Sequence, residues 1–130
     1  MNLFDVISYK EFLVKVFPKG LSGDVLVGQI GITPFSDTKI TVHTRQQPEI
    51  EIKKWGKWGE TFNTVAIVLG SGTVKGLLVK NIYKASYAAL DVQKVERGFR
   101  LKQMSGEWEI DFTVEDLVFD KCMVYMDEAD

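Results

Sequence analysis

The 130-residue sequence is poor in cysteine and histidine, the two residues that most often bind metals in proteins. Cys122 is the only cysteine and His43 the only histidine. One cysteine cannot form a disulfide within the chain, and it leaves no two-cysteine metal site. A chain of this length can still bury a core that is stable without such staples. We therefore expect a protein of the reducing cytoplasm that carries no cofactor and no metal.

The sequence also lacks an excess of charge of one sign and any long apolar run. Its 16 Lys and Arg residues are balanced by 18 Asp and Glu residues, for a net charge of −2. Nucleic-acid binding depends on neutralising phosphates, so this balance argues against DNA or RNA as a partner. Asp5, Lys10 and Glu11 interrupt the first residues, where a signal peptide or membrane span would be apolar. We predict neither a membrane nor a nucleic-acid partner.

What the sequence does contain is a succession of short β-like segments. They are rich in β-branched and aromatic residues and are separated by turn residues. The segments are 25–32, 39–44, 62–70, 74–82, 89–96, 98–105, 107–113 and 117–126. Within one of them, Trp108, Ile110 and Phe112 alternate with acidic residues, which predicts a strand with one buried and one solvent-exposed face.

Turn residues predict how these strands are connected. The pairs Ser71-Gly72, Arg97-Gly98 and Ser105-Gly106 each place a glycine where a tight hairpin needs positive φ. They predict antiparallel pairing of consecutive strands. Across the last of these turns, basic and acidic side chains should face each other on the solvent side of the sheet.

The N-terminal segment carries a helix start signal. Ser8 can cap a helix and Glu11 can complete a capping box, which predicts a helix over about 9–17, ended by Pro18. The predicted fold is mainly β, or α+β by strict count, in a single domain over 1–130. The short helix packs either on an antiparallel sheet or on a two-layer β-sandwich formed by about 24–126.

No group of residues predicts catalysis. His43 lies in an alternating strand without a neighbouring nucleophile, and its simplest interpretation is a solvent-facing residue. Cys122 alternates with Val118, Val124 and Met126, which favours a buried, inert thiol. The glycines of LGSGTVKG lead into a strand and not into a helix, so they do not indicate a phosphate-binding loop. We predict that the protein is not an enzyme.

Acidic residues gather toward the C-terminus. Glu115, Asp116 and Asp120 follow the strand with alternating acidic residues. Most such carboxylates form a solvated sheet face, and the alternative is an acidic docking surface for a partner.

The stretch KKWGKWGETFNTV (53–65) places Trp55 and Trp58 among lysines and glycines, ahead of an apolar strand. One tryptophan can close the open end of the core, while the other can serve as a binding anchor, since tryptophan is enriched at interface hot spots. We expect Trp55 to be buried. We expect Lys57, Trp58 and Glu60 to be exposed and to contact a partner.

Four segments together resemble the immunity protein 50 family of bacterial polymorphic toxin systems. They are PEIEIKKWGKWGETFNTVAIVL, VKGLLVKN, LDVQKVERGFRLKQMSG and EIDFTVEDLVFDKCMVYM, within about 24–126. The resemblance is carried by Pro48, Lys54, Trp55, Asn63, Val65, Val74, Leu77, Val79 and Gly106. The chain departs from the family pattern ahead of the first strand, where LSGDV lacks an expected histidine. The resemblance implies a small, mainly β cytoplasmic protein that binds and neutralises a cognate toxin.

An alternative belongs to another class of function. Exposed aromatic rings also suit small ligands, so the chain can be a carbohydrate-binding β domain in which Trp55 and Trp58 stack on a sugar.

Overall fold

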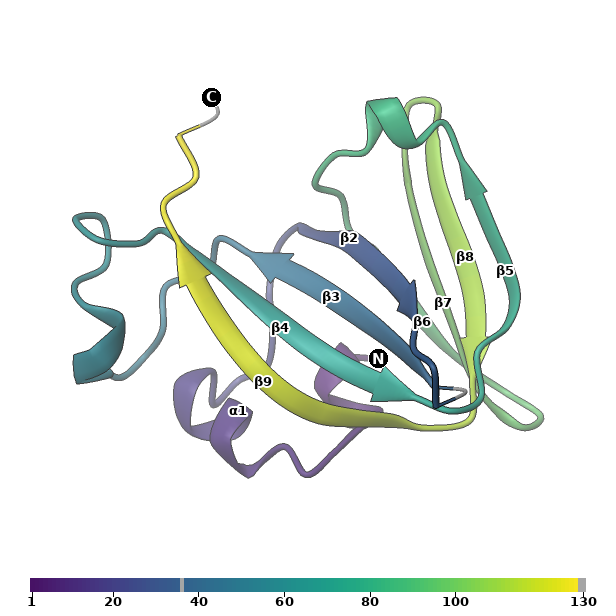
Figure 1. Cartoon of the computed structure of the whole chain (residues 1–130), viewed down its shortest axis with the longest axis horizontal. Coiled ribbons are helices and arrows are strands. Elements are labelled where there is room, and N and C mark those ends of the chain that lie inside the picture. Colours follow the sequence, from purple (N-terminus) through teal and green to yellow (C-terminus); the bar gives the residue numbers. More distant parts are fainter. Residues whose placement is uncertain (36, 129–130) are drawn as a thin grey trace.

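In the computed structural model the chain forms two β-sheets and one short α-helix (Figure 1). The structure describes residues 1–35 and 37–128. The first sheet has the strand order β1 (Ile7–Ser8), β9 (Leu117–Tyr125), β4 (Thr64–Ser71), β3 (Thr38–Thr44) and β2 (Val25–Ile32). The second has the order β5 (Lys75–Lys80), β8 (Trp108–Val114), β7 (Gly98–Ser105) and β6 (Leu90–Val95). The mainly β prediction is confirmed, and each of the eight predicted segments overlaps one strand.

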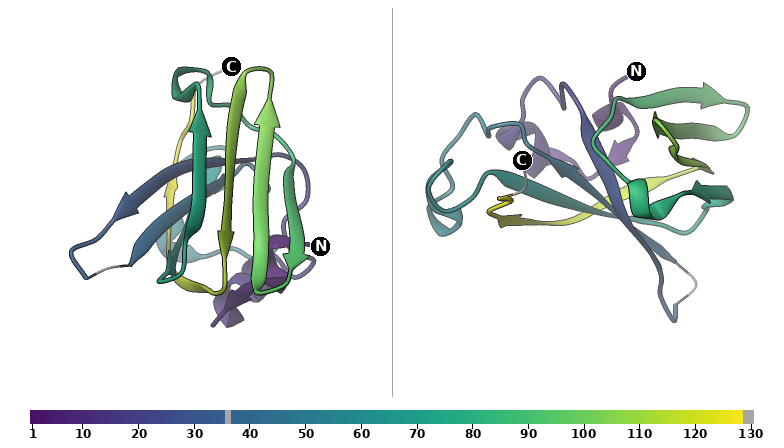
Figure 2. Two further views of the ribbon diagram at one scale, coloured as in Figure 1. Left: turned by 90° about the vertical axis from the view of Figure 1, so that its right-hand side faces the viewer. Right: turned by 90° about the horizontal axis from the view of Figure 1, so that it is seen from above.

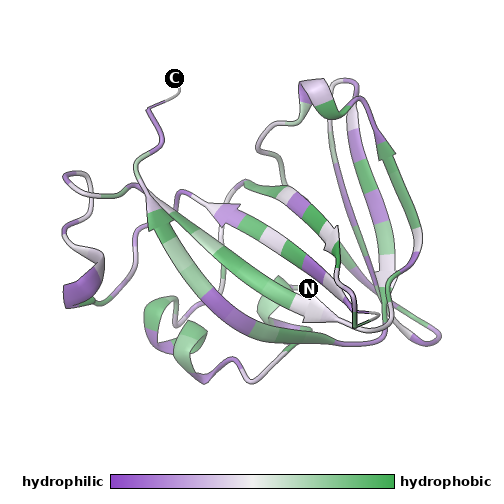
Figure 3. Ribbon diagram, in the orientation of Figure 1, coloured by the Kyte–Doolittle hydropathy of each residue, from purple (hydrophilic) through white to green (hydrophobic). Residues whose placement is uncertain are grey.

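The β7–β8 hairpin shows the predicted alternation of buried and solvent-facing residues. Along β8 the apolar residues are buried and the residues between them are partly exposed. The alternation of polar and apolar residues along β8 can be followed in Figure 3. On the solvent side, Arg100 lies 2.5 Å from Asp111, and Lys102 lies 4.0 Å from Glu109. The hydrogen bond from Arg100 lowers the pKa of Asp111 below its usual range. The predicted cross-strand charge pairing is therefore confirmed.

Two of the three predicted hairpins are present, and the third is wrong. Gly98 and Gly106 have φ values of 107° and 59° and close the β6–β7 and β7–β8 hairpins. The Ser71-Gly72 turn instead leads the chain from β4 in the first sheet to β5 in the second. β5 then pairs with β8, and β4 pairs with β3 and β9. The residues of a turn indicate a local change of direction, but they do not decide which strand completes the pairing.

The two sheets pack with their strands at a steep angle to each other, as Figure 2 shows. Apolar residues from both sheets and from the N-terminal segment form one buried cluster. Gln103 (1% exposed) is a polar member of this interior. Its amide nitrogen donates to the carbonyls of Val25 and Ala88, at 2.7 and 3.1 Å. Its Oε1 accepts from the Val27 N–H and from Trp108 Nε1, both at 3.2 Å. Gln103 therefore ties the second sheet to strand β2 of the first.

The N-terminal helix is shorter than predicted and begins differently. Helix α1 spans Glu11–Val16, and no side chain caps its start. The expected cap, Ser8, belongs to β1, which pairs in parallel with the beginning of β9. The adjacent Ile7 is 4% exposed, so burial of this side chain holds the segment extended. A capping box is present earlier in the chain, where the side chains of Asn2 and Asp5 cap the start of the 3-10 helix η1 (Leu3–Asp5).

The surroundings of Cys122 differ from the prediction because strand β9 contains a bulge. Val68 pairs with Lys121 and Leu69 with Phe119, so Asp120 is an extra residue in the strand. Because a bulge reverses the alternation of side chains, Phe119 packs with Cys122 against the core in place of the predicted Val118. Burial raises the pKa of the Cys122 thiol to about 12, so the thiol is protonated at neutral pH.

Candidate functional site

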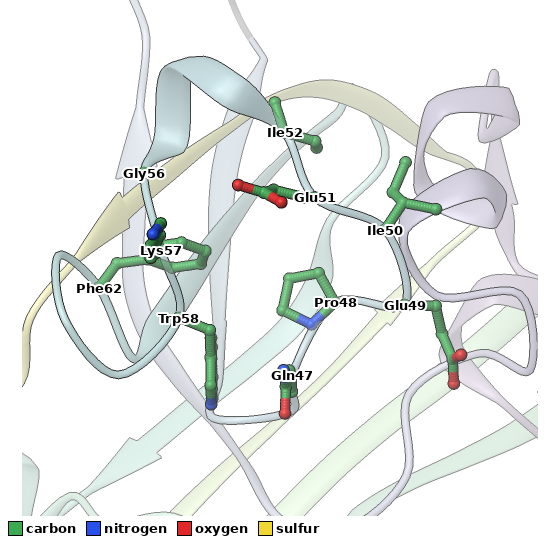
Figure 4. A pocket seen from close by; sticks show the side chains of 10 residues that line it. All are labelled: Gln47, Pro48, Glu49, Ile50, Glu51, Ile52, Gly56, Lys57, Trp58 and Phe62. Carbon is green, nitrogen blue, oxygen red and sulfur yellow. The ribbon is translucent and has the colours of Figure 1, made fainter.

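The long connection between β3 and β4 folds back on itself and forms an open cleft (Figure 4). This connection, 45–63, contains only the single turn of 3-10 helix η2 (Lys53–Trp55). The cleft has a volume of about 310 Å³. It is lined by Gln47, Pro48, Glu49, Ile50, Glu51, Ile52, Gly56, Lys57, Trp58 and Phe62. Long connections of this kind in compact proteins are often functional.

One wall of the cleft, residues 47–52, is tied to the end of helix α1 and to the segment that follows it. The Glu49 N–H donates to the Val16 carbonyl at 2.8 Å. Just before this wall, Gln46 Nε2 donates to the Gly20 carbonyl at 3.0 Å, and Gln46 Oε1 accepts from the Ser22 N–H at 2.7 Å. These bonds hold an irregular strip of chain in one place although it belongs to neither sheet.

The opposite wall, residues 56–62, is held by hydrogen bonds around Thr61. Thr61 Oγ1 accepts from the Lys57 N–H at 2.7 Å and lies 3.2 Å from the Trp55 carbonyl, to which it can donate. The Thr61 N–H donates to the Lys57 carbonyl at 2.9 Å, and the Gly59 N–H donates to the Phe62 carbonyl at 2.7 Å. The chain turns at Gly56, where φ is 87° and an added Cβ would overlap the Thr61 side chain. The loop around Trp58 is therefore preorganised.

Aromatic contacts connect this loop to the core. Trp58 meets Phe62 edge to face, with ring centres 5.4 Å apart, and Phe62 meets Trp55 at 6.0 Å. Trp55 in turn contacts Phe12 of α1 at 5.8 Å, and Phe12 stacks on Phe119 of β9 at 6.0 Å. Trp55 is 9% exposed, which confirms that it is anchored in the core. Trp58 was predicted to be exposed, but it is half-buried, because it packs against Phe62.

The predicted partner-binding residues fall at two ends of the first sheet. Lys57, Trp58 and Glu60 lie in the cleft loop, and the Lys57 and Glu60 side chains are exposed. Glu115 and Asp116 lie in the loop between β8 and β9, close to the far end of β4. The structure therefore does not bring the two predicted groups together.

The acidic group has partners within the chain. Thr73 Oγ1 donates to Asp116 Oδ1 at 2.6 Å and accepts from the Glu115 N–H at 2.8 Å. Lys75 Nζ lies 3.2 Å from the Glu115 carboxylate. Lys39 Nζ lies 3.5 Å from the carboxylate of Asp120, the bulge residue of β9. The contacts of Thr73 and Lys75 hold the β4–β5 turn against the β8–β9 loop.

The sequence did not indicate a second polar cluster, around His43. His43 Nδ1 is hydrogen-bonded to the Tyr125 hydroxyl at 2.7 Å, across strand β4. Nearby, Arg45 stacks over the Tyr87 ring at 3.9 Å and pairs with Asp127 at 3.3 Å. Burial lowers the pKa of His43, and burial raises the pKa of Tyr125 to about 12. The two partners are 82 residues apart, so no local pattern could have found the pair.

Glycine makes room for this histidine. A Cβ at Gly28, on the neighbouring strand β2, would lie 2.8 Å from the His43 ring. In the described residues, no three His, Cys, Asp or Glu side chains gather in a way that could hold a metal ion. Nor does the described part of the chain contain a helix with the length and apolar character needed to cross a bilayer.

Comparison of the chain with protein-family models, with curated proteins and with solved structures gave no match.

Proposed function

We propose that the protein is a non-enzymatic binding protein that contacts a protein partner through the cleft loop, residues 47–62. The observation that carries this proposal is the presentation of Trp58. Hydrogen bonds around Thr61 fix the backbone, and Phe62 fixes the edge of the indole, while the ring still lines an open cleft. A large aromatic side chain held in advance in its bound position loses little entropy on binding, which is the property of an interface hot spot.

We propose a bacterial toxin domain, made by the same cell, as the partner, and its physical occlusion in the cytoplasm as the mode of inhibition. The resemblance to the immunity protein 50 family supports this choice. Two residues that carry it have structural roles here. Trp55 packs in the core, and the Asn63 side chain exchanges two hydrogen bonds with the Asp127 backbone, at 2.7 and 2.8 Å. Such roles suit residues that preserve a fold while the contact surface varies with the partner.

The acidic group at the far end of β4 fits the same proposal as a peripheral contact. Strand β4 has eight residues and so spans about 25 Å. An ordinary protein interface covers about 800 Å² on each partner, which is about 30 Å across. Trp58 and Glu115 lie beyond the two ends of β4, so a toxin domain that contacts both must form an interface somewhat longer than this average.

The test is co-expression with the protein encoded beside this chain. We expect that protein to arrest bacterial growth when produced alone, and we expect this chain to restore growth by forming a 1:1 complex with it. Trp58→Ala should weaken the complex. Growth arrest that continues although both proteins are made, or a neighbouring gene for an unrelated metabolic enzyme, would contradict the proposal.

A second candidate function is small-ligand or carbohydrate binding in the same cleft. The half-buried Trp58 ring lining an open cleft favours it, because sugars stack on such rings. Trp55 cannot take part, since it is buried. Titration of the intrinsic fluorescence with a panel of sugars distinguishes the two functions. A saturable change that is lost in Trp58→Ala supports this candidate, and an unchanged spectrum removes it.

A further inference from the structure

We propose that the cleft binds a cationic side chain, lysine or arginine, of the protein partner, placed between the indole of Trp58 and the carboxylate of Glu51. This inference rests on the proposed function, in which the cleft loop is the partner-binding surface. It adds the chemistry of the group that enters the cleft.

The first component is an aromatic wall with a fixed orientation. Figure 4 shows the Trp58 ring edge-on, with one face turned toward Pro48 and Gln47 on the opposite wall. Phe62 meets the indole almost at right angles, with an interplanar angle of 88°, and the indole also lines the open cleft. The face of an indole carries negative electrostatic potential and attracts lysine and arginine more strongly than the other aromatic rings do.

The second component is a carboxylate without a counter-ion. In Figure 4 the Glu51 carboxylate lies between Pro48 and Phe62, whereas the Glu49 side chain points away from Pro48. Within residues 1–35 and 37–128, neither carboxylate forms an ion pair. Other carboxylates of the chain, such as Asp111 and Glu115, do pair with a lysine or arginine. A cation of the partner can serve as the counter-ion that the Glu51 carboxylate lacks.

Lys57 is the one cationic residue among those that line the cleft. It forms no ion pair with Glu51 in the described part of the chain, and its side chain is exposed. Its backbone groups are engaged with Thr61, which fixes where the side chain begins. Lys57 therefore leaves the Glu51 carboxylate available to a cation of the partner.

The size of the cleft favours a single side chain over an extended ligand. Its volume of about 310 Å³ lies at the lower end of the range for ligand pockets, which begins at roughly 300 Å³. An arginine or lysine can lay its apolar stem against Pro48 and Ile52 while its charged end meets Trp58 and Glu51.

The test compares a cation with a neutral molecule of the same shape. The probes are N-acetyl-arginine amide and N-acetyl-citrulline amide, titrated into the folded chain while the indole N–H signals are followed by NMR. Trp58→Phe identifies the Trp58 signal. We expect the arginine probe to shift that signal with a Kd about fivefold lower than the citrulline probe, the size of a cation–π contact at a partly exposed site.

Two charge-matched variants locate the effect. Glu51→Gln should abolish the preference for the arginine probe. Glu49→Gln removes the same charge, but from a side chain that points away from Pro48, so this variant should retain most of the preference for arginine. Equal binding of the two probes, no shift of the Trp58 signal with either, or equal effects of the two variants would overturn the inference. If Trp58→Ala disrupts the toxin complex but the probes bind equally, only the cation inference fails. If Trp58→Ala does not weaken the complex, the proposed contact surface itself is wrong.

Discussion

At the scale of single residues, Trp55 and Trp58 differ in what surrounds them although only two residues separate them. Trp55 contacts Phe12 and Phe62 and is 9% exposed, so it belongs to the core. Trp58 contacts Phe62 and lines the cleft. Gly56 produces this difference, because its positive φ of 87° turns the chain between the two indoles. In the KKWGKWG stretch the first tryptophan thus packs in the core, and the second lines the cleft at the surface.

Substitution of each tryptophan should separate folding from binding. Trp55→Ala leaves a cavity between the rings of Phe12 and Phe62 and should lower the free energy of unfolding by about 3 kcal/mol. Trp58→Ala should lower it by only about 1 kcal/mol, because Trp58 is only partly buried and lines an open cleft. Denaturant titration of both variants measures the difference. A larger loss of stability for Trp58→Ala than for Trp55→Ala would show that the second tryptophan is the structural one.

His43 should make stability depend on pH near neutrality. Burial lowers its pKa in the folded protein below the value of 6.5 for an unburied histidine. Below about pH 6.5 the unfolded chain therefore binds more protons than the folded chain, and the free energy of unfolding falls as the pH falls through this value toward the folded pKa. Since His43 is the only histidine, His43→Gln should flatten the curve between about pH 5 and 7. A stability that increases on acidification in this window would contradict the assignment.

At the scale of elements, the β7–β8 hairpin was predictable and the β4–β5 connection was not. The hairpin depends on neighbouring residues: alternating Trp108, Ile110 and Phe112, and a glycine at the turn. The β4–β5 connection depends on Thr73, which bonds to Glu115 and Asp116, over 40 residues away. Periodicity cannot reveal such a contact. The short parallel strand β1 was missed for the same reason, because its partner Leu117 lies at the other end of the chain.

Trp108→Ala tests the buried face of the hairpin. Trp108 is 3% exposed, and its indole N–H donates to Gln103, which in turn holds β2. Removing the ring should lower the free energy of unfolding by about 3 to 5 kcal/mol, the usual cost of truncating a core aromatic residue. Thermal or denaturant unfolding measures this loss, and an unchanged midpoint would mean that Trp108 is not part of the core.

Thr61→Val tests whether the cleft loop is held by the Thr61 hydroxyl. Valine keeps the shape of threonine but cannot accept the bond from the Lys57 N–H, so the Lys57 amide should exchange with solvent about tenfold faster, for a lost bond of about 1.4 kcal/mol. Thr61→Ser keeps the hydroxyl and serves as the control. Hydrogen exchange followed by NMR reads out this amide directly. Equal exchange in the two variants would show that the hydroxyl does not hold the loop.

The candidate site was predicted only in part, and the reason again lies in distance along the chain. The sequence indicated Lys57, Trp58 and Glu60, because tryptophans between glycines are unusual in a strand. It did not indicate Glu51 or Pro48, which reach the cleft because the connection folds back on itself. Thr61 was missed as well, because its hydroxyl acts on the backbone of Trp55 and Lys57, a contact that no pattern in the sequence marks.

At the scale of the whole molecule, the arrangement of the two sheets leaves the cleft loop open. Figure 1 shows the loop at the end of β4 that lies away from the second sheet, while the second sheet stands over the other end. The cleft thus lies at the strand ends of the first sheet, where β3 and β4 are connected, and away from the second sheet. A partner can approach Trp58 along this end without displacing any element of the fold.

The central claim is that residues 47–62 form the partner-binding surface, and hydrogen exchange of the complex tests it most directly. Exchange is measured by mass spectrometry for the free chain and for its complex with the protein encoded beside it, the proposed toxin. We predict that peptides covering Gln47–Phe62 show the largest protection, with weaker protection around Glu115. The exposed hairpin turn at Arg97 should exchange equally in both states. Unchanged exchange over Gln47–Phe62, together with new protection at the β5 edge or the Arg97 turn, would contradict the claim.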